Sequence, residues 1–186
     1  MGMVGDSLRE SAIINLSGAV TMVVDDSPFA AEITSRALLG FGVRTRYSIR
    51  SAPEAMEVLQ SDEVDLLVVD CDMPGVDGFD LVHWLRRSGP PNAFTPVIMT
   101  APHIRRSMVA RARDCGANFV ITKPFSAASL LERIVWVARD DRPFLEVGDY
   151  LGPDRRFRDG EPPGHERRAE VLRKLQSEVV PSEAVS

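Results

Sequence analysis

Five residues with acidic, hydroxyl or ammonium side chains follow apolar runs at four points of the sequence. They are the pair Asp25 and Asp26, then Asp70, Thr100 and Lys123. Three carboxylates gathered in one place repel one another and require a cation, and all-oxygen ligands suit Mg²⁺. A hydroxyl and an ammonium group opposite the metal are what the oxygens of a transferring phosphoryl group need. In such a site Asp70 acts as the nucleophile and forms an aspartyl-phosphate.

The use of lysine supports a specific role for Lys123. Of the 22 basic residues only Lys123 and Lys174 are lysines, and the rest are arginines. Lysine is a compact point charge and arginine a planar fork, so a lysine at a strand end suggests a specific contact. Chance in an arginine-rich chain is the alternative reading.

The apolar runs predict buried strands that carry these residues to one edge of a sheet. They lie at residues 20–24, 65–70, 96–99 and 119–122. Helical patterns at residues 28–39, from 53 onward, and at 79–87, 103–115 and 127–139 alternate with them, which is typical of a parallel α/β sheet. In residues 43–49, apolar or β-branched side chains alternate with polar ones, which predicts an edge strand with one face in water. Ligands bind at the carboxyl ends of parallel strands, so this edge is the candidate site.

Helical spacing also predicts shared faces. In the helix at 28–39, one apolar face is expected to hold Phe29, Ile33 and Ala37. In the helix at 103–115, one apolar stripe is expected to hold Ile104, Met108, Ala112 and Cys115. The arginines of that helix lie largely elsewhere and make a basic face, which is either solvated or a partner surface.

Four motifs make residues 19–140 resemble the receiver domain of two-component response regulators. They are Val23-Val24-Asp25-Asp26-Ser27, Val69-Asp70-Cys71-Asp72-Met73-Pro74-Gly75-Val76-Asp77-Gly78, Met99-Thr100-Ala101 and Thr122-Lys123-Pro124-Phe125. The order and spacing of these motifs are highly specific. The resemblance implies a flavodoxin-like (βα)5 fold, with a five-stranded parallel sheet in the order 2-1-3-4-5 and helices on both faces.

The resemblance also implies a function. Asp70 would accept a phosphoryl group from a histidine kinase or a histidine phosphotransfer protein, and Thr100 and Lys123 would contact that group. Mg²⁺ would be held by Asp26, Asp70 and the backbone carbonyl of Asp72, with Asp25 helping through water. The Lys123–Pro124 bond is expected to be cis. Such a protein is a phosphoacceptor switch with at most slow self-dephosphorylation, not an enzyme with substrate turnover.

The remaining segments bear on the output of such a switch. Residues 1–18 are expected to be a flexible leader, and residues 141–186 a partly disordered tail that is too short for a DNA-binding domain. Residues 165–179 have apolar side chains at helical spacing, which predicts a short helix that needs a partner surface. The expected protein is a stand-alone receiver that acts on an unknown downstream protein. Its expected output face is the fourth helix, fifth strand and fifth helix, which is also a candidate homodimer surface.

Two positions depart from the family pattern. Val120 stands where receivers often have an aromatic residue that rotates on activation, and Phe119 is expected to face the other side of the strand. Asp72 adds a carboxylate two positions after the acceptor, where it can lie over the phosphoryl group or repel it. The first departure bears on the aromatic half of the switch, and the second on the rate of hydrolysis or on the choice of kinase.

Composition excludes several other classes of protein. The net charge of −5 argues against direct binding of nucleic acid. No apolar run is long enough to span a membrane, and the two cysteines fit no disulfide or metal framework, so a cytoplasmic protein is expected.

Two other functions remain open. A phosphorylation-independent interaction module of the same fold would not need all five site residues. A haloacid-dehalogenase-like phosphohydrolase also uses an Asp-x-Asp motif, here Asp70-Cys71-Asp72, but carries it on its first strand and has further acids after the lysine.

Overall fold

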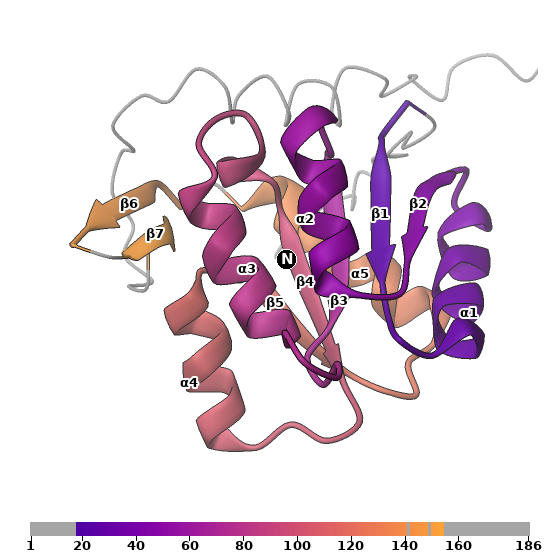
Figure 1. Ribbon diagram of the computed structural model, residues 1–186. Coiled ribbons are helices and arrows are strands. Elements are labelled where there is room, and N and C mark those ends of the chain that lie inside the picture. The colour runs from indigo at the N-terminus through magenta and orange to yellow at the C-terminus, as the bar shows by residue number, and fades with distance from the viewer. Residues whose placement is uncertain (1–17, 141, 149, 155–186) are drawn as a thin grey trace, which may run out of the picture.

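The protein is built around one parallel sheet with helices on both faces. The computed structural model describes residues 18–140, 142–148 and 150–154 (Figure 1). The strands of this sheet are β1 (Thr21–Val24), β2 (Thr45–Ile49), β3 (Leu66–Asp70), β4 (Val97–Ala101) and β5 (Phe119–Thr122). They are parallel and lie in the order β2-β1-β3-β4-β5, which confirms the predicted topology and the edge position of β2.

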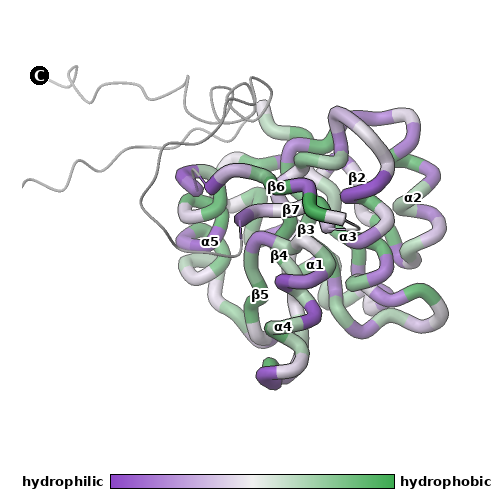
Figure 2. Tube along the Cα trace, turned by 90° about the vertical axis from the view of Figure 1, so that its left-hand side faces the viewer, coloured by the Kyte–Doolittle hydropathy of each residue, from purple (hydrophilic) through white to green (hydrophobic). Residues whose placement is uncertain are grey.

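The helices form two layers. They are α1 (Pro28–Leu39), α2 (Ala52–Ser61), α3 (Gly78–Arg87), α4 (Arg106–Cys115) and α5 (Ala127–Arg139), with a 3-10 turn at Asn92–Phe94. Side chains of α1 and α5 pack in one core cluster, and those of α2, α3 and α4 pack in the other. The strands β1, β3 and β4 between the clusters are buried along their whole length, and β4 and β5 are mostly hydrophobic in Figure 2.

The face of α1 that sequence spacing selected is largely exposed. Phe29 is 76% exposed and Ile33 is 45% exposed, whereas the residues that α1 buries are Ala31, Thr34 and Leu38. The hydroxyl of Thr34 donates to the carbonyl of Ala30, so this polar side chain is satisfied within the core. Spacing alone did not indicate which side of α1 is buried, because the helix has apolar residues on two sides and a hydroxyl on the buried one.

Helix α4 is shorter than predicted. It begins at Arg106, and Arg105 at its N-cap gives no side-chain hydrogen bond, so no capping residue marks the start of the helix in the sequence. Ile104 lies before the helix and is 38% exposed, which removes it from the expected stripe. Ala112 and Cys115 are buried as expected, and Met108 packs against the same cluster.

A β-hairpin follows α5 and folds back onto the helices of the parallel-sheet domain. Its strands are β6 (Phe144–Val147) and β7 (Tyr150–Pro153), which pair antiparallel and lie beside α3 and α4 (Figure 1). The ring of Phe144 meets that of Phe94 edge to face, with centroids 5.5 Å apart. Residues 1–17 of the predicted leader (residues 1–18) and the predicted helix at 165–179 lie outside the described residues.

One buried arginine connects these parts of the fold. Arg86, in the last turn of α3, is 1% exposed. Its guanidinium donates to the carbonyls of Gly116, Ala93 and Thr95 at 2.8–2.9 Å. It also lies over the ring of Phe144, 5.1 Å from the centroid. Arg86 therefore joins α3 to the end of α4, to the segment before β4 and to the hairpin.

Candidate functional site

The five predicted site residues lie at the carboxyl edge of the sheet. Asp25 and Asp26 follow β1, Asp70 ends β3, Thr100 lies near the end of β4, and Lys123 follows β5. Asp70 is paired in register with Thr100 across β3 and β4. The parallel order of the strands therefore brings these side chains to one edge, as the sequence predicted.

A buried ion cluster forms the centre of this edge. The Nζ of Lys123 lies 2.6 Å from Oδ2 of Asp25 and 3.1 Å from Oδ2 of Asp70. The side chains of Asp25 and Asp70 are only 3% and 7% exposed. The other oxygen of Asp25 accepts a hydrogen bond from the backbone N–H of Ser27 at 3.0 Å, which orients the carboxylate at the start of α1. One ammonium group thus bridges two carboxylates from different strands.

Burial and charge act in opposite directions on the ionisable groups. Burial raises the pKa of Asp70, although the nearby ammonium of Lys123 opposes this rise. Burial lowers the pKa of Lys123, but the carboxylates of Asp25 and Asp70 outweigh it and raise that pKa overall. The lysine therefore stays positively charged beside the acids.

The acidic residues fit a small, oxygen-binding cation. One carboxylate oxygen from each of Asp25, Asp26 and Asp70 lies within 4.8 Å of the others. In addition, Oδ1 of Asp70 is buried and has no hydrogen-bond partner. A buried carboxylate oxygen without a partner is costly, and coordination of a cation would satisfy it. The predicted backbone ligand, the carbonyl of Asp72, stays a prediction.

Thr100 is as deeply buried at this edge as Asp25. It is 2% exposed, and its hydroxyl donates to the carbonyl of Val69 at 3.5 Å, a long hydrogen bond. The Lys123–Pro124 peptide bond is cis, as expected. Val120 packs in the cluster with α4, whereas Phe119 meets Trp136 of α5 with ring centroids 5.5 Å apart, so the two do face opposite sides.

The loop after β3 is held against the backbone of Asp70 at Gly78. The N–H of Gly78 donates to the carbonyl of Cys71 at 3.2 Å. A Cβ at residue 78 would overlap the carbonyl oxygen of Asp70. A glycine is therefore required here, and sequence reasoning missed this role because a glycine at a helix start resembles an ordinary turn residue.

Replacement of Gly78 by alanine is expected to destabilise the protein by about 1–3 kcal/mol, since the clash is with backbone that cannot rotate away. Chemical denaturation would measure the loss. Gly18→Ala is the matched control, because nothing lies within 4 Å of a Cβ there. Equal stability of the two variants would show that the loop has room to move.

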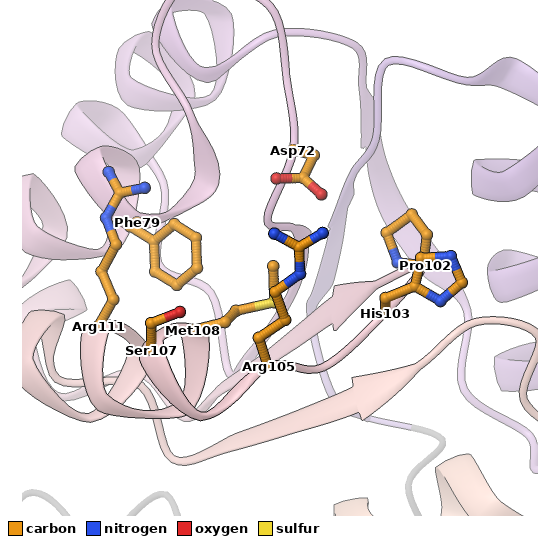
Figure 3. A pocket seen from close by; sticks show the side chains of 8 residues that line it. All are labelled: Asp72, Phe79, Pro102, His103, Arg105, Ser107, Met108 and Arg111. Atoms are coloured by element: carbon orange, nitrogen blue, oxygen red, sulfur yellow. The ribbon is translucent and has the colours of Figure 1, made fainter.

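A pocket of about 430 Å³ opens beside this loop (Figure 3). Asp72 lines it with residues before and within α4, and its carboxylate points toward the guanidinium of Arg105. Arg111 lies over the ring of Phe79 at 4.3 Å and pairs with the N-cap Asp77 at 2.7 Å. The side chain of Asp72 is thus directed to this pocket and is not part of the acidic cluster.

This sheet order, with an acidic cluster and a lysine at its carboxyl edge, defines a receiver-type signalling domain. A family model for the response regulator receiver domain matches residues 21–135. The chain belongs to this family, whose members are phosphoacceptor switches rather than classical enzymes and bind Mg²⁺ at an acidic pocket.

Individual relatives agree with this assignment. The chain is 29% identical over 123 residues to chemotaxis protein CheY-3 of Vibrio cholerae serotype O1, an alignment that covers 66% of this chain and 93% of that protein. It is 30% identical over 138 residues to transcriptional regulatory protein TcrA of Mycobacterium tuberculosis, covering 72% of this chain and 53% of TcrA. The solved structure of Vibrio cholerae chemotaxis protein CheY4 superposes with a TM-score of 0.60 at 26% identity, covering 64% of this chain and 98% of that one.

No helix among the described residues is both long enough and apolar enough to cross a membrane.

Proposed function

We propose that this protein is a response regulator that accepts a phosphoryl group on Asp70 from a histidine kinase or a histidine phosphotransfer protein. The observation that carries the proposal is the state of Asp70. Its carboxylate is buried, one oxygen meets Lys123 at 3.1 Å, and the other has no hydrogen-bond partner. A carboxylate used only for structure is normally satisfied on both oxygens.

In the proposed reaction an oxygen of Asp70 attacks phosphorus. The bond from phosphorus to the donor's imidazole nitrogen breaks, and that nitrogen keeps the electron pair. Lys123 stays protonated and neutralises charge on the phosphoryl oxygens, while the hydroxyl of Thr100 turns from the carbonyl of Val69 to donate to one of them. Asp25 and Asp26, with Asp70 and the carbonyl of Asp72, would hold Mg²⁺, which shields the incoming negative charge when it is bound.

The proposed output is a change at the face of α4, β5 and α5 that is read by a partner protein. The dianion added to Asp70 changes the preferred conformation of this face. Thr100 and Lys123 would contact the phosphoryl group, and β4 and β5 connect these two residues to the face. The same face is the proposed surface for a homodimer.

Both cysteines are buried free thiols, which supports a cytoplasmic location.

Intact-mass spectrometry after incubation with acetyl phosphate and Mg²⁺ tests the proposal. We expect one added phosphoryl group, a loss of labelling with EDTA, and slow decay of the adduct once the donor is removed. No adduct, with Mg²⁺ binding intact, would favour a phosphorylation-independent module. Sustained release of phosphate from small phosphoesters would favour a phosphohydrolase instead.

A further inference from the structure

An apolar groove of about 380 Å³ crosses the proposed output face. Its walls come from the segment before α4, from α4 itself, and from β5, α5 and β7. The apolar or aromatic side chains that line it include Ile104, Val109, Val120, Trp136, Tyr150 and Pro153. Such a surface resembles the grooves in which amphipathic helices bind.

Two of these side chains are exposed although they are aliphatic. Val109 is 49% exposed and Ile104 is 38% exposed. They line the same groove as Trp136, whose ring meets that of Phe119 edge to face. A rigid aromatic side chain beside exposed aliphatic ones is the composition of a binding surface, since each gains from the removal of water.

The chain itself runs along the groove before it leaves the described residues. Tyr150 and Pro153 of β7 form part of the wall, and β7 is followed directly by Asp154. The backbone of Asp154 is held by two hydrogen bonds, to the carbonyl of Pro143 at 2.8 Å and from the guanidinium of Arg142 at 3.2 Å. Residues 155–186 therefore start at the edge of this groove.

The sequence that follows contains a segment suited to it. Residues 165–179 have Ala169, Leu172, Leu175 and Val179 at a spacing that forms one apolar stripe on a helix. Such a short helix is marginal in water without a surface to pack on. The ten residues 155–164 between β7 and this segment span at most about 36 Å, which is ample to bring it back over the groove.

We propose that residues 165–179 bind this groove as an amphipathic helix of the same chain. The bound segment covers the face of α4, β5 and α5, so it competes with any downstream protein for that face. This inference rests on the proposed function for its regulatory meaning. Ile104 lies four residues after Thr100 and Val120 three before Lys123, so both walls of the groove are close in sequence to the phosphorylation site.

Hydrogen–deuterium exchange of the full-length protein tests the binding. We expect the backbone of residues 165–179 to exchange slowly in the wild type. Leu172→Glu should raise its exchange by about tenfold or more, because a charge replaces a buried leucine. Ser177→Glu is the matched control, since it adds the same charge on the opposite side of the predicted helix, and it should leave protection unchanged. Unprotected exchange in the wild type would overturn the proposal.

A groove-side variant identifies the surface that is bound. Val109→Glu, at an exposed position that tolerates charge, should remove protection from residues 165–179 to the same extent as Leu172→Glu. Protection that survives Val109→Glu would mean that the segment packs elsewhere. Protection that rises with protein concentration would mean that the groove binds a second copy of the protein. Either result would overturn the proposal.

Phosphoryl labelling separates this inference from the proposed function. None of the three variants changes a residue of the acidic cluster, so all should form the adduct on Asp70. A labelled protein with an unprotected segment would contradict only the docking. A protected segment in a protein that takes no label would contradict only the proposed function.

Discussion

Replacement of Asp70 by asparagine is expected to abolish the Mg²⁺-dependent phosphoryl adduct. Asparagine has nearly the same shape, so the fold should persist, but its amide is a poor nucleophile and cannot form the acyl phosphate. It also removes one of the two carboxylates that Lys123 contacts, at 3.1 Å. Intact-mass spectrometry with acetyl phosphate measures the result directly, and circular dichroism checks that the variant is folded.

Asp72→Asn is the matched control for this experiment. Asp72 lies two positions along the same loop, but its side chain is exposed and directed to the pocket beside Arg105 (Figure 3). We expect this variant to keep the adduct, with a change in its lifetime at most. Labelling that persists in Asp70→Asn, or that is lost only in Asp72→Asn, would place the acceptor on another residue.

Replacement of Arg86 by methionine is expected to destabilise the protein by roughly 3–5 kcal/mol, which corresponds to a fall in melting temperature of about 10–20 °C. Methionine fills much of the same volume but donates no hydrogen bonds. The carbonyls of Gly116, Ala93 and Thr95 would then lose a buried donor. Thermal and urea denaturation measure the loss.

Arg87→Met is the control, because Arg87 is the next residue of α3 and is exposed. Its removal should cost less than about 1 kcal/mol. Hydrogen exchange adds a second measurement, since the loss of the contact with Phe144 should also loosen the β6–β7 hairpin. Similar stability of the two variants would contradict a structural role for the buried guanidinium.

The sheet and the residues at its edge could be predicted from the sequence because two strong signals coincide. Each buried strand is a short apolar run, and each run ends in or is followed by a polar residue that marks the carboxyl end of the strand. The parallel order then brings Asp25, Asp70 and Lys123 together without any further information. The spacing of the motifs also identifies the family, and the family predicts the order of the strands.

The orientation of α1 could not be predicted in the same way. Its sequence offers two apolar faces, and hydrophobicity alone favours the one with Phe29 and Ile33. The buried face instead uses Thr34, which satisfies its hydroxyl on the carbonyl of Ala30. Local hydrogen bonding of this kind makes a polar residue acceptable in a core, and periodicity takes no account of it.

Arg86 was missed for a related reason. A charged residue on a helix is usually solvated, so its burial was not expected. The available signal was positional, since Arg86 follows Phe79 and Val82 at helical spacing and those two residues are buried. Its acceptors are backbone carbonyls distant in sequence, and the β6–β7 hairpin that covers it has no counterpart in the motifs that identify the family.

The ion pair between Lys123 and Asp25 joins residues that are 98 positions apart in the chain. During synthesis on the ribosome, β1 and β3 emerge well before β5, so a nascent chain presents Asp25, Asp26 and Asp70 without the ammonium that bridges two of them. Domains form their long-range contacts only when the required segments are available. The acceptor site is therefore a late product of folding, and a chain cut short before residue 123 would hold the acids without the cation that pairs them.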